Sequence, residues 1–475
     1  MELRPFFFGL LMTSMGLEVY GQWMPVQENL STPKIIEPQM SSDPGVLKIR
    51  NDERNQPKQF YPPKIRLSPT PSILPSSSLD IFATKHKTIF QNLQLSFGLY
   101  RELMNINRDK NFMFSPPTFS LALTMLGLQA CPQTRKKVLN GLGLSSWVIS
   151  EAPSYRDHYN LGKYLQSQLP SSEGCQSEVY SMVVGNQPDE QLQDKFVNMA
   201  WNSYHTEVIV RPPILPQISE LQTSALKKRK TQDEIVSFVK RNTFVIYSDI
   251  SFKGQWTNFF EKNLTMPFRV MSNFRVAVPA MQHLGMFRLQ YCAPLKSYVL
   301  QLPYTCNSTS YFIMPEDRGN RATENIPLST YIKDWTQPFP PSLWKLHIPK
   351  FTVSGNNILE KVLPKLGFSD IFSPSEAGIK GIFVKDQSYS IEELPSELCG
   401  PQEVARTSQL GSLQINHSAE LIVDEKGVKN KKKYQTEYMP RVRTFYFNRP
   451  FVIVILTQHN EVIIMGRVMN PMKNT

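Results

Sequence analysis

The chain lacks the short motifs that mark the common enzyme classes. Its 475 residues contain no Gly-x-Ser-x-Gly nucleophile elbow and no phosphate-binding glycine loop. Histidine is scarce, with seven residues, and these are scattered without the spacing that metal ligands share. The sequence therefore predicts a protein that is not an enzyme and that needs no metal or cofactor.

Long apolar runs and a dense set of cysteines are also missing. Beyond the N-terminus, no uninterrupted run reaches roughly 18 apolar residues, the length that suggests a membrane span. Five cysteines occur, at positions 131, 175, 292, 306 and 399, and their spacing fits no zinc or Cys-x-x-Cys motif. We expect the protein to be a monomer. Because the number of cysteines is odd, at least one thiol in that monomer must remain unpaired. Because 41% of the residues are apolar, the core is large enough not to need a disulfide framework.

The N-terminus has the pattern of a secretory signal peptide. Arg4 precedes the apolar run FFFGLLM at residues 6–12, and residues 19–21 (VYG) offer a cleavage site after Gly21. We therefore expect residues 1–21 to be removed and the protein to be secreted into the extracellular space. A buried N-terminal helix is the alternative, whereas the run is too short for a membrane anchor.

Residues 22–84 are predicted to form a proline-rich, disordered tail. Ten prolines lie between positions 22 and 80, and proline lacks the amide donor that helices and sheets require. Three sequons, at Asn29, Asn263 and Asn307, are candidate glycosylation sites in a secreted chain. A fourth, at Asn416, lies in a predicted strand.

Positive charge is in excess, with 52 Lys and Arg residues against 40 Asp and Glu, a net charge of +12. Such a surface favours anionic partners. The densest cluster, KKRK at 227–230, resembles a nuclear signal, but the predicted secretion argues against nucleic acid. Heparin or another polyanion is therefore the expected anionic partner.

Residues 85–475 read as one domain with helices first and strands later. Apolar residues recur at helical spacing over 85–104, and residues 118–129 form a helix too apolar to lie at the surface. Strands are predicted at 111–117, 244–252, 274–278, 298–302, 310–314, 344–349 and 421–423, and a buried hairpin at 451–456 and 462–467. This order indicates an α+β fold.

Several segments of this domain resemble the serpin family. They are NFMFSPPT at 111–118, GLGL at 141–144, ISFKGQW at 250–256, VPAM at 278–281, FNRPF at 447–451 and MGRVMNP at 465–471. The resemblance runs from about residue 85 to the end and is greatest to the clade of antitrypsin and the hormone-binding serpins. It implies three β-sheets, about nine helices and an exposed reactive loop at 425–446. Residues 383–412 look like an inserted loop.

The resemblance also implies how the loop works. In inhibitory serpins a serine protease cleaves the loop, which then inserts into the main sheet as a new strand and carries the acylated protease with it. Counting from the hinge places the scissile bond at Arg441–Val442, with a second basic site at Arg443. An arginine there suits a trypsin-like serine protease. Both arginines can equally be read as solvated loop charges.

Four residues match the region where the family's main sheet opens: Ser115, Thr118, Trp256 and His417. Ser248 stands where the family has a buried asparagine. We interpret His417 as a core histidine that orders hydrogen bonds rather than as a catalytic group.

The hinge of the loop departs from the inhibitory pattern. Glu425 and Gly427 match the family, but the small residues expected next are replaced by VKNKKKY at 428–434. Side chains of an inserted strand alternate between two faces, so alternate residues would face the core in the family register: Val428, Asn430, Lys432 and Tyr434.

A shift of one residue does not remove the problem. It turns Lys429, Lys431 and Lys433 inward instead, so either register buries lysine. Burying an unpaired ammonium costs on the order of several kcal/mol. The sequence therefore predicts a secreted, non-inhibitory serpin that acts as a carrier, a ligand or a protease substrate. An inhibitor of trypsin-like proteases with Arg441 as bait, and a heparin- or polyanion-binding protein, are the alternatives.

Overall fold

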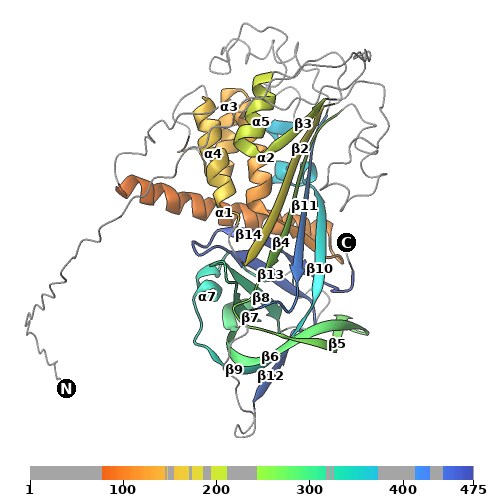
Figure 1. Ribbon diagram of the computed structural model, residues 1–475. Coiled ribbons are helices and arrows are strands. Elements are labelled where there is room, and N and C mark those ends of the chain that lie inside the picture. The colour runs from red at the N-terminus through yellow and green to blue at the C-terminus, as the bar shows by residue number, and fades with distance from the viewer. Residues whose placement is uncertain are drawn as a thin grey trace, which may run out of the picture. The chain divides into compact units, whose positions relative to one another are not determined.

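The computed structural model describes residues 78–144, 147, 154–170, 174–185, 194–210, 243–316, 323, 326–372, 412–427 and 442–473. All of them lie in one compact unit, Ile65–Thr475 (Figure 1). The predicted signal peptide, most of the predicted tail and residues 383–411 of the predicted inserted loop lie outside the described residues, whereas Ser412 already belongs to a strand. The first helix begins at Ser78, so the end of the predicted tail is helical and that boundary was placed too late.

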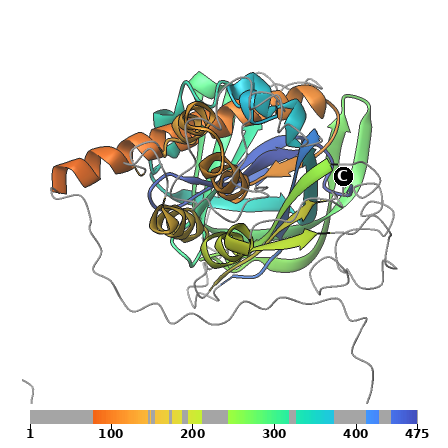
Figure 2. The ribbon, with the colours of Figure 1, turned by 90° about the horizontal axis from the view of Figure 1, so that it is seen from above.

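The first half of the described chain supplies most of the helices. They are α1 (Ser78–Ile106), α2 (Pro116–Leu128), α3 (Pro132–Leu142), α4 (Tyr155–Ser167) and α5 (Asp194–Tyr204). Every residue of α2 is buried, as its uniformly apolar sequence predicts. Helices α3, α4 and α5 pack around α2, and the group lies together in Figures 1 and 2. The described residues add α7 (Ile332–Thr336) and four 3₁₀ helices.

One sheet has five strands in the order β10-β11-β4-β2-β3. Their bounds are β10 (Phe351–Ile358), β11 (Ser412–Val423), β4 (Thr243–Gly254), β2 (Cys175–Gly185) and β3 (Thr206–Val210). The central pair, β4 and β11, is parallel, whereas β10 and β2 flank it in antiparallel pairs. Helix α2 packs against β4, so the helical group covers this sheet at its centre.

The remaining nine strands form two sheets that share one long strand. Their order is β1-β14-β13-β8-β7-β6-β9-β12, and β5 also pairs with β6. Their bounds are β1 (Phe112–Phe114), β5 (Glu261–Met271), β6 (Phe274–Cys292), β7 (Ser297–Pro303), β8 (Thr309–Pro315), β9 (Ser342–Pro349), β12 (Arg443–Tyr446), β13 (Phe451–Leu456) and β14 (Val462–Val468). Residues 274–287 of β6 pair with β5 and β9, and residues 288–292 pair with β7. With the five-stranded sheet this makes three, which confirms the expected α+β architecture.

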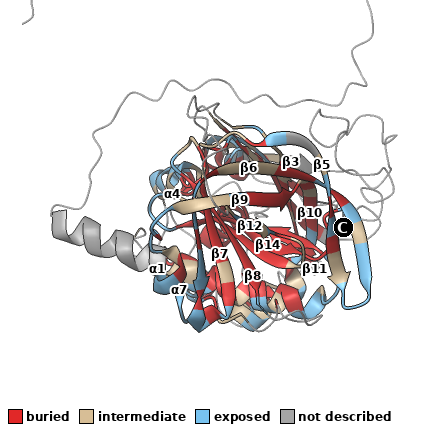
Figure 3. Cartoon of the chain, turned by 90° about the horizontal axis from the view of Figure 1, so that it is seen from below, coloured by how far each residue is buried: buried red, intermediate tan, exposed pale blue. Residues whose placement is uncertain are grey.

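Two apolar clusters form the core. One joins the helices to the five-stranded sheet and to strands β7, β8, β13 and β14, and the other lies among strands of the three sheets. Strands β13 and β14 are buried at every position, which confirms the predicted hairpin (Figure 3). The sequence did not predict β2, β3, β5, β10 or β12, because polar side chains interrupt their apolar alternation.

The five-stranded sheet meets β1 of the neighbouring sheet at a close backbone contact. The side-chain amide of Asn357 on β10 donates to the Met113 carbonyl at 2.8 Å. A Cβ atom at Gly355 would lie 2.5 Å from the backbone nitrogen and oxygen of Met113. Glycine is therefore required for β10 and β1 to approach this closely.

Replacing Gly355 with alanine should destabilise the fold. The added methyl meets backbone rather than a mobile side chain, so we expect a loss of about 1–3 kcal/mol or more in the free energy of unfolding. Gly98→Ala is the matched control, because there the Cβ meets only the end of the Leu366 side chain at 3.0 Å, within helix α1. Urea unfolding of both variants measures the effect. Equal stability of Gly355→Ala and the wild type would show that the contact is not tight.

Candidate functional site

The candidate site runs along the seam between β4 and β11. The two strands pair in parallel from Thr243↔Ser412 to Lys253↔Ile422. The predicted reactive loop leaves the end of β11 and returns at β12. Its residues Val428, Asn430, Lys432 and Arg441 lie outside the described residues, whereas the hinge up to Gly427 and the return from Val442 are described.

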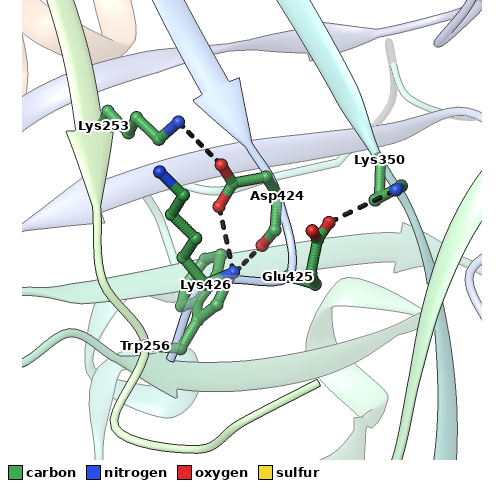
Figure 4. A network of polar contacts seen from close by, with 6 residues as sticks. All are labelled: Lys253, Trp256, Lys350, Asp424, Glu425 and Lys426. Carbon is green, nitrogen blue, oxygen red and sulfur yellow. Dashed lines mark hydrogen bonds and ion pairs between the residues drawn. The ribbon is translucent and has the colours of Figure 1, made fainter. Parts of the chain in front are cut away.

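Trp256 anchors the start of the loop. Its backbone N–H donates to the carbonyl of Lys426 at 3.0 Å, and its indole Nε1 donates to the carbonyl of Asp424 at 2.8 Å. The indole is 1% exposed and stacks on Tyr304, with ring centroids 4.3 Å apart. Two hydrogen bonds from one buried side chain and its backbone thus hold the segment that precedes the predicted loop (Figure 4).

Two ion pairs fix the same segment from opposite sides. The Lys253 ammonium, near the end of β4, lies 2.7 Å from the Asp424 carboxylate. Lys350, between β9 and β10, lies 3.2 Å from the carboxylate of Glu425. The second oxygen of Asp424 accepts from the backbone N–H of Lys426 at 3.0 Å. Asp424 therefore joins β11 to β4 across the seam, and Glu425 joins the hinge to the β10 side (Figure 4).

Gly427 has a steric role. It forms an isolated parallel bridge with Trp256, and a Cβ atom at this position would collide with the backbone carbonyl of Asn258. A side chain here is therefore incompatible with the observed hinge. The resemblance identified Trp256, Glu425 and Gly427. Lys253 and Asp424 lie in matching segments, but nothing in the sequence indicated that they pair with each other or that Lys350 pairs with Glu425.

A disulfide lies beside this hinge. Cys175, at the start of β2, is bonded to Cys306 in the turn between β7 and β8, and the two Cα atoms are 5.7 Å apart. Cys131 is also disulfide-bonded, whereas Cys292 is a free buried thiol. The expected unpaired thiol is thus present. The size of the core left the pairing of the other cysteines open, and the structure pairs Cys175 with Cys306.

Ser115, Thr118 and His417 form a second cluster under the middle of the seam. The Ser115 backbone N–H donates to His417 Nε2 at 2.8 Å, and the Thr118 hydroxyl donates to the Ser115 hydroxyl at 2.9 Å. Since Nε2 accepts, the ring proton lies on Nδ1, which donates to the Ser248 hydroxyl at 3.0 Å. All four side chains are buried. Ser248 thus fills the role of partner to His417.

Burial controls the chemistry of this histidine. Desolvation lowers the pKa of His417 from 6.5 to about 3, and Phe119 packs against the ring with centroids 5.8 Å apart. The ring is therefore neutral at physiological pH. With both nitrogens in hydrogen bonds, it has no lone pair or proton available for catalysis.

The predicted site residues therefore fall into two groups along one seam. The cluster around His417 lies at mid-seam, level with Ser248, and the group around Trp256 lies at the end of β4. The structure does not bring them into one pocket. In the part of the chain that is described, no three His, Cys, Asp or Glu side chains gather into a metal site.

The return of the loop constrains the second basic site. Val442 directly precedes β12, whose residues Arg443 to Tyr446 pair in parallel with Trp344 to His347 of β9. The Arg443 guanidinium lies over the Trp344 ring, 4.5 Å from its centroid. Since this strand is already paired, we expect the bond after Arg443 to be cleaved less readily than a bond in an unpaired segment.

The sequons differ in their surroundings. Asn307 is exposed in a turn with φ of 58°, which leaves room for a glycan. Asn263 lies in β5, Asn29 lies outside the described residues, and Asn416 is buried in β11. Among the described helices, none is long and apolar enough to cross a membrane.

The buried His417 predicts a pH dependence of stability. Below about pH 6.5 the unfolded chain takes up a proton that the folded chain excludes, so the free energy of unfolding falls by up to ~1.4 kcal/mol per pH unit toward pH 3. His417→Gln should be about 1–3 kcal/mol less stable at pH 7.5, because the Ser115 amide loses its acceptor geometry. The gap between variant and wild type should narrow between pH 6.5 and 4.5.

Urea unfolding at several pH values measures this gap. His158 is equally buried, with its pKa lowered to about 3, but it is present in both proteins and cancels. His459→Gln, in the exposed turn after β13, is the control and should follow the wild-type curve. A gap that stays constant with pH would contradict a neutral, buried His417.

Known proteins share this architecture. A family model described as "Serpin (serine protease inhibitor)" matches residues 90–471. Alpha-1-antitrypsin 1-5 of Mus musculus is 28% identical over 405 residues, covering 83% of this chain and 92% of the relative. Serpin A9 of Homo sapiens is 25% identical over 421 residues, covering 85% of this chain and 94% of that protein.

Solved structures agree on the fold. Human kallistatin superposes with a TM-score of 0.63 at 24% identity, covering 82% of this chain and 99% of kallistatin. Human thyroxine-binding globulin gives a TM-score of 0.62 at 23% identity, covering 82% of this chain and all of that chain. The family match covers most of the chain, including the segments before and after the predicted loop. The chain therefore belongs to the serpin family, in clade A with the antitrypsin-like proteins.

Proposed function

We propose that this chain is a secreted, non-inhibitory serpin that acts as a carrier, a ligand or a protease substrate. The family's description is that of serine protease inhibitors, which bind proteases rather than catalyse a reaction. The observation that carries the proposal is the buried face of the seam, where an inserted loop strand would have to lie between β4 and β11.

This face is closed and apolar. The inward residues of β4 include Ile246, Ile250 and Phe252, and those of β11 include Ile415 and Leu421, all fully buried. Inserting a strand separates the two and places alternate side chains of the new strand over this surface. Val428 suits such a position, whereas a lysine finds no carboxylate there.

The polar pair His417 and Ser248 in the seam does not lower the cost of burying a lysine. His417 and Ser248 are register partners across the seam, and their hydrogen bond joins the two strands directly. An inserted strand breaks that bond, so both groups then need new partners from the loop. The neutral ring of His417 cannot pair the charge of an inward-facing Lys432 ammonium. Burial of an unpaired charge costs on the order of several kcal/mol.

The cost of burying lysine slows loop insertion relative to hydrolysis of the acyl bond between loop and protease. Insertion must be faster than hydrolysis of the acyl bond, and each ~1.4 kcal/mol of added barrier slows insertion about tenfold. A barrier of several kcal/mol therefore turns an inhibitor into a substrate.

Several features support secretion. The N-terminal pattern is that of a signal peptide, and disulfides such as Cys175–Cys306 persist in oxidising compartments. The exposed Asn307 follows directly after this bond and is the best placed of the described sequons.

Inhibition of a trypsin-like protease is the second candidate function. It rests on the intact hinge at Glu425 and Gly427 and on Arg441 as bait, with Val442 just outside the paired β12. Heparin or polyanion binding has less support. The exposed cations of α4 are Arg156 and Lys163, and Lys163 lies over the Tyr159 ring, 5.8 Å from its centroid.

Mixing the full chain with trypsin tests the proposal. We expect only loop-cleaved protein, with no SDS-stable complex and an unchanged melting temperature after cleavage, because the cut loop does not extend the sheet. A covalent complex, or a sharp rise in melting temperature on cleavage, would contradict the proposal and support inhibition of trypsin-like proteases.

Two matched triple variants locate the obstacle. Val428→Thr/Asn430→Ala/Lys432→Ala removes the inward set of the family register, and Lys429→Ala/Lys431→Ala/Lys433→Ala removes the same number of side chains from the other face. We expect only the first variant to gain thermal stability on cleavage. A gain in the second variant alone would place the strand one residue out of that register, and a gain in neither would show that the lysines are not the obstacle.

A further inference from the structure

A cleft opens between β5, β6, β7, β8 and β12, and none of the hinge or mid-seam residues line it. Its volume is about 560 Å³, inside the range of about 300–1,000 Å³ typical of small-molecule sites. The lining residues that matter below are Arg269, Arg275, Arg449, Glu316, Tyr298 and Phe445.

Two of its arginines oppose each other across a strand pair. Arg269 on β5 and Arg275 on β6 are register partners in the antiparallel β5–β6 hairpin. Side chains at such positions start about 4.5–5.5 Å apart, and like charges there destabilise the pair. An unfavourable pair at the wall of a cleft is explained if an anion binds between the two guanidinium groups.

A third arginine adds to the positive charge. The Nε of Arg449 donates to the carbonyl of Pro315 at 2.9 Å, which fixes the guanidinium at the wall of the cleft. Among the described lining residues Glu316 is the one acid, and its carboxylate accepts a hydrogen bond from the Tyr291 hydroxyl at 2.5 Å. Three cations thus face one anion, which leaves the lining with an excess of positive charge.

The lining also contains two packed aromatic rings. The rings of Tyr298 and Phe445 lie 4.9 Å apart, and both are half-buried. Phe445 is supported from behind by Phe447, at 5.3 Å, and by Trp344, at 6.1 Å. A planar ring in the cleft therefore meets a preformed aromatic surface, which lowers the entropy cost of binding.

We propose that this cleft binds a small aromatic anion, a planar ring that carries a carboxylate or sulfate group. The anionic group lies between Arg269 and Arg275 and accepts charge-assisted hydrogen bonds from both. The ring packs against Tyr298 and Phe445. Binding removes the like-charge repulsion in the hairpin, so the empty protein carries an unfavourable contact that the ligand neutralises.

The ligand also reaches the end of the predicted reactive loop. Thr444, Phe445 and Tyr446 of β12 line the cleft, so a bound molecule bridges β12 to β5 and β6. The backbone amides of β12 should therefore exchange with solvent more slowly when the cleft is filled. This inference does not depend on whether the loop inserts.

Calorimetric titration of the full chain with naphthalene-2-sulfonate tests the site. We expect saturable binding of one molecule per chain that weakens as salt is added. Inorganic sulfate, which has the charge without the ring, and 2-naphthol, which has the ring without the sulfonate, should each bind at least tenfold more weakly. No saturable binding of naphthalene-2-sulfonate below about 1 mM would overturn the proposal, since well-placed drug-sized ligands exceed this affinity.

Variants of the opposed arginines separate binding from folding. Arg275→Gln and, independently, Arg269→Gln should each weaken binding at least tenfold. Neither should lower the melting temperature without ligand, because each relieves the repulsion. Arg288→Gln is the control, since Arg288 is exposed farther along β6 and does not line the cleft. Wild-type affinity in both cleft variants, or an equal loss in Arg288→Gln, would show that the opposed pair is not the anion site.

Discussion

The parallel pairing of β4 with β11 is the interaction on which the other features depend. Parallel strands need a long connection, and here that connection contains β5 to β9, five of the nine strands of the other two sheets, and also β10. The seam therefore closes only around a nearly complete fold. Once closed, it sets the positions of both functional clusters, because His417 meets Ser248 in its middle and Asp424 meets Lys253 at its end.

The sequence predicted the parts of the fold whose signals are local. Helix α2 and the β13–β14 hairpin are continuous apolar segments, and the family resemblance rests on similar short motifs. The contacts that fix the hinge could not be predicted. A lysine such as Lys253 carries no sign of an aspartate far along the chain, and Cys175 is separated from Cys306 by 131 positions. Arg269 and Arg275 likewise read as ordinary solvated charges until the hairpin register places them opposite each other.

The loop combines two properties that usually occur apart. Its anchors are intact at both ends: Trp256 and Gly427 hold the start, and β12 pairs with β9 at the return. The sequence between them is rich in lysine, and the apolar face under the seam gives a cation no acceptor. The molecule thus keeps both anchors of the loop, whereas the lysines in the sequence between them oppose its burial.

The Cys175–Cys306 bond constrains the two sides of the five-stranded sheet differently. It attaches the first residue of β2 covalently to the β7–β8 turn, next to Tyr304 and the Trp256 that it supports. Strands β2 and β4 are therefore tethered at this end to the sheet beneath them, whereas β10 and β11 have no such link among the described residues. Widening of the seam near the hinge is therefore opposed by a covalent bond on the β2–β4 side, and by noncovalent contacts such as Asn357 with Met113 on the β10–β11 side.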